Sequence, residues 1–307
     1  MTLNWQHTLK LPISCTGVGI HSGKTIRMRI LPAEENAGIS FVRTDLKDNN
    51  CIAATYDNVV DTMMCTVSAN QHGAKVAVIE HLMSALWGCG IDNAIIEVDD
   101  AEVPVMDGSA APFVALIKKA GVIAQDQPRK FVEIISPIKI EHQGKVIELL
   151  PNDSFEVDFH IDFEHPNIGS QHFVFNEEQD LFSHDISRAR TFGFIEDVQK
   201  LQSMGLARGA SLENAVALSR EGGILNSEGL RFEKEFVKHK ILDCIGDLYL
   251  AGARIKGKVF ALKAGHMMNN LILRKLFAEK EAYRLVDYGF PSQPMNCSLN
   301  NPIYADA

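Results

Sequence analysis

The stretch Phe236-Val-Lys-His-Lys-Ile-Leu-Asp-Cys-Ile-Gly-Asp247 decides how the rest of the chain is interpreted. Its apolar residues recur with helical spacing, and Gly252 suits a helix C-cap, so we predict a helix over about 232–250. His239 and Asp243 stand four residues apart and therefore point the same way from this helix. An imidazole and a carboxylate so placed can hold two positions of a zinc coordination sphere. A solvated His/Asp pair on a helix surface is the plainer interpretation of this helix taken alone.

A second segment, Val76 to Gly88, gives the first half of the chain the layout of the second half. In each half the first helix ends at a glycine, and a strand, a loop and a second helix follow it. These elements are expected at about 77–88, 94–98 and 110–120, and again at about 232–250, 259–263 and 267–279. Each half places a histidine early in its first helix, His81 and His239. If the halves pack face to face, His81, His239 and Asp243 converge on one ion and leave a fourth position for water, as catalytic zinc requires.

Glu80 stands next to His81 and gives this arrangement a base. Zinc lowers the pKa of its water to about 7, but amide hydrolysis still needs a group that takes the proton. A carboxylate beside a ligand, and itself not a ligand, is typical of metallohydrolases.

Six motifs make the chain similar to a known family. The sequence resembles the UDP-3-O-acyl-N-acetylglucosamine deacetylases, the zinc enzymes of lipid A synthesis in Gram-negative bacteria, from about residue 5 to about 280. The motifs are Val78-Ile-Glu-His-Leu82, Pro104-Val-Met-Asp-Gly-Ser-Ala110, Ser187-Arg-Ala-Arg-Thr-Phe-Gly193, Gly229-Leu-Arg-Phe232, Val237-Lys-His-Lys-Ile-Leu-Asp243 and Gly265-His266.

The expected fold is α+β, with two similar domains over 1–126 and 127–307. Each half is expected to be a sheet with two helices, and the resemblance implies that the helical layers pack face to face. The polar stretch 122–130 is the expected linker. Residues 193–223 are not accounted for by the repeat and are interpreted as an insertion.

The resemblance implies hydrolysis of the N-acetyl group of UDP-3-O-(3-hydroxyacyl)-N-acetylglucosamine, releasing acetate, with Zn²⁺ as cofactor. Glu80 is then the base, and the resemblance assigns Thr191 to the oxyanion. His266, kept cationic and oriented by Asp247, is expected to protonate the leaving amine.

Further residues are expected to bind substrate. The resemblance places His21 at the site, Met63 and Cys65 at its mouth, and Asp162 and Phe163 against the uridine, although core burial explains Phe163 equally well. Lys240 and Lys263 offer point charges for the diphosphate. An amphipathic helix at 194–204, if it does not simply bury its apolar face, forms a passage for the acyl chain. The residues expected along this passage are Phe192, Phe194, Ile195, Val198 and Leu201.

Composition excludes several classes of protein. The 307 residues carry a net charge of −9, which argues against nucleic acid as a partner and against a polybasic membrane anchor. Six cysteines without a CxxC motif indicate reduced thiols. No signal peptide and no apolar run of about 18 residues is present, so we expect a cytoplasmic protein without stable membrane insertion. We expect it to be a monomer.

Gly17-Val-Gly-Ile-His-Ser-Gly-Lys-Thr25 is close to a phosphate-binding loop, but Val18 occupies the position of the required first glycine. The alternating residues 26–30 that follow predict a strand, so this stretch is interpreted as a hairpin turn. Two other functions remain open. A zinc amidase or peptidase with another substrate would keep the metal residues, and a nucleotide-sugar-binding regulator would not need Glu80.

Overall fold

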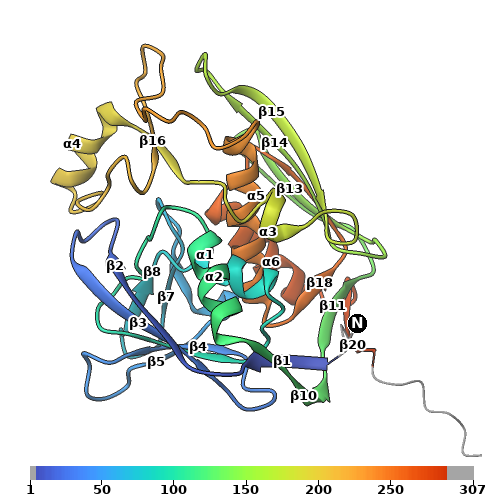
Figure 1. Ribbon diagram of the computed structural model, residues 1–307. Coiled ribbons are helices and arrows are strands. Elements are labelled where there is room, and N and C mark those ends of the chain that lie inside the picture. Colours follow the sequence, from blue (N-terminus) through green and yellow to red (C-terminus); the bar gives the residue numbers. More distant parts are fainter. Residues whose placement is uncertain (1–4, 289–307) are drawn as a thin grey trace, which may run out of the picture.

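The computed structural model describes residues 5–288, and two layers of helices lie between two five-stranded sheets (Figure 1). The first sheet has the order β2-β3-β9-β4-β5, with only β9 and β4 parallel. Its strands are β2 (Ile13–Val18), β3 (Thr25–Pro32), β4 (Ile39–Arg43), β5 (Cys51–Ala53) and β9 (Ala94–Val98). Buried and exposed residues alternate along β3, so one face of this sheet is buried under α1 (Glu80–Gly88) and α2 (Ala111–Ala120).

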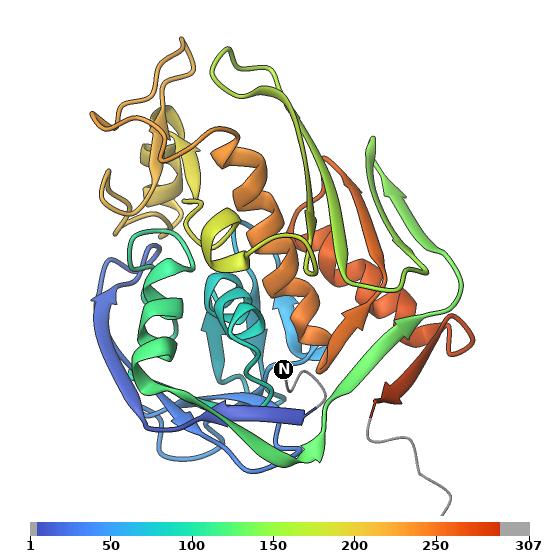
Figure 2. The ribbon, with the colours of Figure 1, turned by 45° about the vertical axis from the view of Figure 1, so that its right-hand side comes forward.

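The second sheet repeats this topology. Its order is β12-β13-β19-β14-β15, and again only the third and fourth strands, β19 and β14, run parallel. The strands are β12 (Ile138–His142), β13 (Lys145–Leu150), β14 (Glu156–Phe163), β15 (Gly169–Asn176) and β19 (Lys258–Leu262). Helices α5 (Glu235–Leu248) and α6 (His266–Ala278) cover its inner face (Figure 2). The predicted α+β fold with facing helical layers is confirmed, whereas the boundary at 126 stays a prediction.

The same place in each half carries an insertion, between the edge strand β5 or β15 and the helix α1 or α5. In the first half it holds the sheet of β6 (Val59–Asp61), β7 (Val67–Ala69) and β8 (Lys75–Ala77), preceded by a 3₁₀ turn η1 (Tyr56–Asn58). In the second half it holds α3 (Phe182–Asp185), β16 (Phe192–Phe194), α4 (Ile195–Ser203) and β17 (Val216–Leu218). The part with α4 stands apart from the sheets at the upper left of Figure 1.

Strands also form the connection between the two halves. The expected linker at 122–130 is largely the strand β10 (Val122–Pro128), because antiparallel pairing with β1 (Trp5–Leu9) satisfies its backbone in spite of its polar side chains. Strand β11 (Lys130–Ile134) ends before Pro137, which has no backbone N–H to donate, and β12 begins after it. Strand β11 instead joins β18 (Arg254–Lys256) and β20 (Tyr283–Asp287) in a third sheet.

The helix ends are set by backbone conformation. Helix α1 begins at Glu80 and not at 77, because Val78 has a φ of 60° and cannot be helical. Helix α5 begins after Lys234, whose φ is 61°, and runs into a 3₁₀ turn, η2 (Tyr249–Ala251). The expected cap at Gly252 is confirmed, since this residue adopts φ 78° and ψ 0°.

A glycine sets the distance between the two helical layers. A Cβ atom at Gly246 of α5 would overlap the carbonyl oxygen of Glu80 and lie 2.8 Å from its carbonyl carbon and 3.1 Å from the Ser84 nitrogen. The backbones of α1 and α5 therefore touch at this point. The contact brings the start of α1 against the last turn of α5, next to Asp243 and Asp247.

The predicted hairpin turn before residue 26 is also confirmed. Strands β2 and β3 pair from Ile13↔Ile30 to Val18↔Thr25, so the glycine-rich stretch is the turn between them and no phosphate-binding loop. Glu102 fixes this turn by accepting hydrogen bonds from the backbone N–H groups of His21 (2.7 Å) and Ser22 (3.0 Å).

Candidate metal centre

The three predicted metal ligands lie together where α1 meets α5. Nε2 of His81 is 3.4 Å, and Nε2 of His239 is 3.3 Å, from Oδ1 of Asp243. The two imidazole rings stand nearly perpendicular, with centroids 5.0 Å apart. All three side chains are buried, and their ligand atoms lie within 4.8 Å of one another. The i, i+4 spacing on α5 and the contact at Gly246 together produce this convergence.

The chemistry of these side chains fits a zinc ion. Two imidazoles and one carboxylate are a known ligand set for catalytic zinc. Burial lowers the pKa of His239 to about 3, so this imidazole is neutral and offers a lone pair. Its Nδ1 faces the backbone oxygen of Ala189 at 3.1 Å, which leaves Nε2 for the metal. Oδ1 of Asp243 is buried without a hydrogen-bond partner among the described residues, as expected for an atom that ligates an ion.

Lys240 lies against the other oxygen of Asp243, Oδ2, with which it forms a hydrogen-bonded ion pair. Burial alone would raise the pKa of Asp243, but its interactions with His239 and Lys240 hold the pKa well below its ordinary value. Asp243 is therefore ionised, and its two oxygens serve different partners.

Glu80 is the first residue of α1 and lies beside the ligand group without belonging to it. Its Oε2 accepts a hydrogen bond of 3.1 Å from the backbone N–H of Thr66, and its Oε1 is 4.0 Å from Nε2 of His266. Burial raises the pKa of Glu80, against the opposing effect of His266 and His81. A carboxyl group with a raised pKa in this position is suited to accept a proton near neutral pH.

His266 and Asp247 form a second acid–base pair at the same centre. Nδ1 of His266 is 2.7 Å from Oδ2 of Asp247, and its Nε2 is 4.0 Å from both Glu80 and Asp243. Burial alone would lower the pKa of His266, but the charge and hydrogen bond of Asp247, supported by Glu80 and Asp243, raise it to about 9. At neutral pH this imidazole is a cation that faces the ligand group.

Two residues that the sequence did not single out hold Asp247. The Thr66 hydroxyl donates to its Oδ1 at 2.5 Å, and the Asn269 amide donates to its Oδ2 at 2.9 Å. Thr66 thus supports both Glu80 and Asp247. Asn269 lies three residues after His266 on α6, and this spacing on one helix face was a usable signal. No local pattern links Thr66 to Asp247, which is 181 positions away in the chain.

Thr191 belongs to a firmly anchored segment. It stands two residues after Ala189, whose carbonyl oxygen faces His239, and its own backbone N–H donates to the carbonyl oxygen of Gly108 at 2.8 Å. Buried Arg190 fixes the same segment through Glu235 (2.9 Å) and Glu228 (2.8 Å). The segment therefore has a defined position beside the metal ligands.

Comparison with known proteins agrees with this geometry. A family model described as UDP-3-O-acyl N-acetylglycosamine deacetylase matches residues 6–278. The chain belongs to this family. Among curated relatives, proteins named UDP-3-O-acyl-N-acetylglucosamine deacetylase from Shewanella loihica and Shewanella frigidimarina are each 49% identical to it, and that from Shewanella halifaxensis is 48% identical. Each match spans 286 residues, 92% of this chain and 93% of the relative.

His21, Met63 and Cys65 come from the first half of this deacetylase fold. The backbone of His21 touches the second insertion, because its carbonyl accepts a hydrogen bond from Arg208 at 3.1 Å, and its Nε2 is buried without a partner among the described residues. Met63 is 54% exposed, whereas Cys65 is buried, so only Met63 of this pair faces solvent. Their contact with substrate stays a prediction.

Asp162, Phe163 and Lys263 lie together at the end of β14. Lys263 forms an ion pair of 2.7 Å with Asp162, and both side chains are exposed. Phe163 is half-buried and packs edge-on against Phe192, at 5.7 Å between centroids, and Phe192 in turn lies 6.2 Å from the ring of His239. An aromatic wall therefore runs from the end of β14 to the metal ligands.

Helix α4 does not bury its apolar face as most amphipathic helices do. None of its residues is buried, and Ile195 is 45% exposed. Phe194, Val198 and Leu201 are half-buried. These side chains are available to an apolar ligand, which is the condition that the acyl-passage hypothesis requires.

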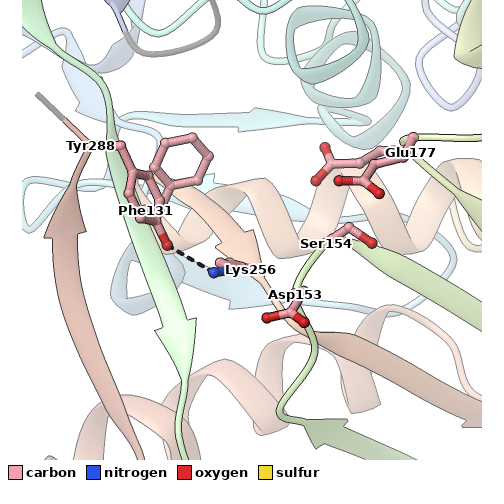
Figure 3. A pocket seen from close by; sticks show the side chains of 7 residues that line it. Phe131, Asp153, Ser154, Glu177, Lys256 and Tyr288 are labelled. Carbon is pink, nitrogen blue, oxygen red and sulfur yellow. Dashed lines mark hydrogen bonds between the residues drawn. The ribbon is translucent and has the colours of Figure 1, made fainter. Parts of the chain in front are cut away.

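A cavity of about 390 Å³ lies elsewhere, at the third sheet (Figure 3). Its lining residues are Phe131, Asp153, Ser154, Glu177, Glu178, Lys256 and Tyr288, none of which belongs to the centre. The Lys256 ammonium donates to the Tyr288 hydroxyl at 3.0 Å across it. The buried titratable groups whose pKa values are shifted, Glu80, His239, Asp243 and His266, lie at the metal ligands and do not line this cavity, so the chemistry is assigned to the metal centre. Within residues 5–288, no helix combines the length and apolar character of a membrane span.

Proposed function

We propose that this chain removes the N-acetyl group of UDP-3-O-(3-hydroxyacyl)-N-acetylglucosamine by zinc-dependent hydrolysis and releases acetate, the committed step of lipid A synthesis. We further propose that it works as a monomer in the cytoplasm of a Gram-negative bacterium. Its two domains are proposed to divide near residue 126. The observation that carries the reaction is the convergence of His81, His239 and Asp243, with Glu80 and His266 next to them and 4.0 Å from each other.

His81, His239 and Asp243 would hold the ion as its three protein ligands. A zinc ion bound there supplies a Lewis acid for the amide carbonyl and lowers the pKa of a bound water to about 7. Asp243 stays ionised because of its partners, and His239 stays neutral because of its burial, so neither has to lose a proton before it binds the ion.

Glu80 is the proposed base. It takes the proton of the attacking water, and the hydrogen bond from Thr66 keeps the carboxylate turned toward the centre. Burial raises its pKa and makes it a stronger base than an exposed glutamate, while the charge on His266 opposes this rise and favours the carboxylate form.

His266 is the proposed acid. Its cation stabilises the negative charge that develops on the amide oxygen, and its Nε2 proton passes to the leaving amine. Asp247 fixes the ring through Nδ1 and keeps the imidazole charged. The Thr191 hydroxyl donates a second hydrogen bond to the oxyanion.

The substrate contacts follow from the surroundings of the centre. Lys263, with Asp162 as its partner in the free protein, attracts the diphosphate and Lys240 adds charge beside it. Phe163 and Asp162 receive the uridine, His21, Met63 and Cys65 surround the sugar, and the apolar residues of α4 with Phe192 line the acyl chain. These assignments rest on the residues' positions around the centre and on family membership.

The deciding experiment measures acetate release from the UDP-sugar together with bound metal. Glu80→Gln should retain the metal and lose at least ~10²-fold in kcat, the usual share of a general base. His239→Ala should lose the metal itself, and His184→Gln, an exposed histidine on α3, serves as the control. Full metal and activity in His239→Ala would contradict the assignment of the centre.

The same assay separates the other two functions. A zinc amidase or peptidase with another substrate would release no acetate from the UDP-sugar but would act on other amides. A nucleotide-sugar-binding regulator would bind the UDP-sugar unchanged and would be insensitive to Glu80→Gln.

A further inference from the structure

A second cluster of metal-ligating side chains lies on the outer face of the second sheet. Along β14, Val157, Phe159 and Ile161 are buried toward α5, so Asp158 and His160 point to the opposite face. On β15, His172 is the direct cross-strand partner of His160. The register of the sheet therefore brings one carboxylate and two imidazoles together, away from the helical layers.

The donor atoms of these residues converge on one point. Nε2 of His160 is 3.0 Å, and Nε2 of His172 is 2.9 Å, from Oδ1 of Asp158. All three ligand atoms lie within 4.8 Å of one another. The two rings are stacked with centroids 4.0 Å apart and an angle of 11° between their planes.

A neighbouring lysine favours the ionised form of Asp158, which is the form that binds a metal ion. Nζ of Lys258 lies 3.1 Å from its other oxygen, Oδ2, and also 2.9 Å from Glu156. Burial alone would raise the pKa of Asp158, but the hydrogen bonds from Lys258 and His172 lower it. This lysine is shared by Asp158 and Glu156 and occupies only Oδ2 of Asp158, so Oδ1 is left to the two imidazoles.

We propose that Asp158, His160 and His172 form a second, surface site for a divalent transition-metal ion of the zinc, nickel or copper type. Imidazole nitrogen with one carboxylate oxygen is the ligand set that these ions prefer over magnesium or calcium. Water completes the coordination, because His160 is 35% and His172 50% exposed, whereas Asp158 is 16% exposed.

Binding requires a small movement of the rings. The lone pairs of stacked imidazoles lie in parallel planes, so the two rings must tilt toward a common ion. The exposed outer side of His172 leaves space for this rotation, and the strands themselves need not move. The ion then clamps β14 to β15 by their side chains. This site is independent of the proposed deacetylase reaction.

The experiment uses protein whose first site is already filled with one equivalent of zinc. Further Zn²⁺ is added by equilibrium dialysis, and bound metal is counted for the wild type, His160→Gln and His172→Gln. Glutamine keeps a hydrogen-bond donor for Asp158, so the fold is retained. His184→Gln is the matched control, because His184 forms a lone His–Asp pair of 2.9 Å with Asp185 on another surface.

The wild type and His184→Gln should bind one more equivalent of zinc. In the other two variants its affinity should fall by at least ~10-fold, since even outer-shell partners of a metal typically contribute 10-fold or more. Electron paramagnetic resonance with one added equivalent of Cu²⁺ should show two coupled nitrogens in the wild type and one in His172→Gln. The proposal is overturned if the wild type binds no second equivalent, if the variants bind it equally well, or if His184→Gln loses it too.

Discussion

Replacing Gly246 by alanine tests whether the contact between α1 and α5 builds the metal centre. The new Cβ would overlap the Glu80 oxygen and lie 2.8 Å from its carbonyl carbon, where carbon atoms normally stay ~3.5–4.0 Å apart. The obstruction is the backbone of α1, which cannot turn aside as a side chain can, so the helices must separate by roughly 1 Å. Alanine favours a helix by about 1 kcal/mol over glycine, but overpacking costs about 1–3 kcal/mol, so the net effect should be destabilising.

The effect on the centre should exceed the effect on stability. His81 and Glu80 move with α1, whereas His239, Asp243 and Asp247 stay on α5. A misplacement of about 1 Å between reacting groups typically costs about 10²-fold in rate. We therefore expect a lower thermal midpoint, weaker zinc binding and a loss of about two orders of magnitude in acetate release.

The assays are differential scanning calorimetry, metal analysis after dialysis, and acetate release. Gly193→Ala is the control for stability and metal content, because a Cβ there would meet no atom within 4 Å. If Gly246→Ala keeps the wild-type melting temperature, metal content and rate, the helices are not in backbone contact at this point and the reasoning fails.

Three further predictions concern protonation, buried charge and substrate. His266 must be protonated to act, so activity should fall as the pH rises through about 9. In Asp247→Asn the charge that raises the pKa of His266 is removed, while burial still lowers this pKa. The basic limb of the kcat/KM profile should therefore move to lower pH. An unchanged limb would exclude His266 as the acid. Arg190→Gln leaves Glu235 buried beside a neutral partner and should cost ~3–5 kcal/mol in unfolding free energy, measured by urea denaturation. Arg29→Gln in the exposed pair Arg29–Glu97 is the control and should change the unfolding free energy little. If Arg190→Gln changes it as little as Arg29→Gln does, the argument is contradicted. Shortening the acyl chain by four carbons should lower kcat/KM by ~10²-fold, since each buried methylene contributes ~0.8 kcal/mol. A flat response would show that α4 does not bind this chain.

The sequence predicted the parts of the structure that depend on short-range spacing. Helical periodicity placed α1, α5 and α6 within a few residues, and the i, i+4 relation paired His239 with Asp243. The predicted repeat of two halves extends to strand order and strand direction. Local patterns suffice here because side-chain direction on a helix is fixed by position alone.

Contacts between residues far apart in the chain could not be predicted from the sequence. The pairing of β10 with β1 joins residues more than 100 positions apart, and polar side chains such as Gln125 gave no sign of a strand. Thr66 supports Asp247 through a contact that no spacing rule anticipates. The outer-face histidines depend on the register between β14 and β15, which the alternation within one strand does not determine.

The contact at Gly246 has a thermodynamic consequence. The ion would be shared between the two helical layers, since His81 belongs to one and His239 with Asp243 to the other, so it acts as a cross-link that forms only when the layers are docked. By mass action, a metal present at 1,000 times its dissociation constant adds about 4 kcal/mol to the stability of the docked state. Gly246 permits that docking, so one missing side chain links the folding of the whole chain to the supply of zinc.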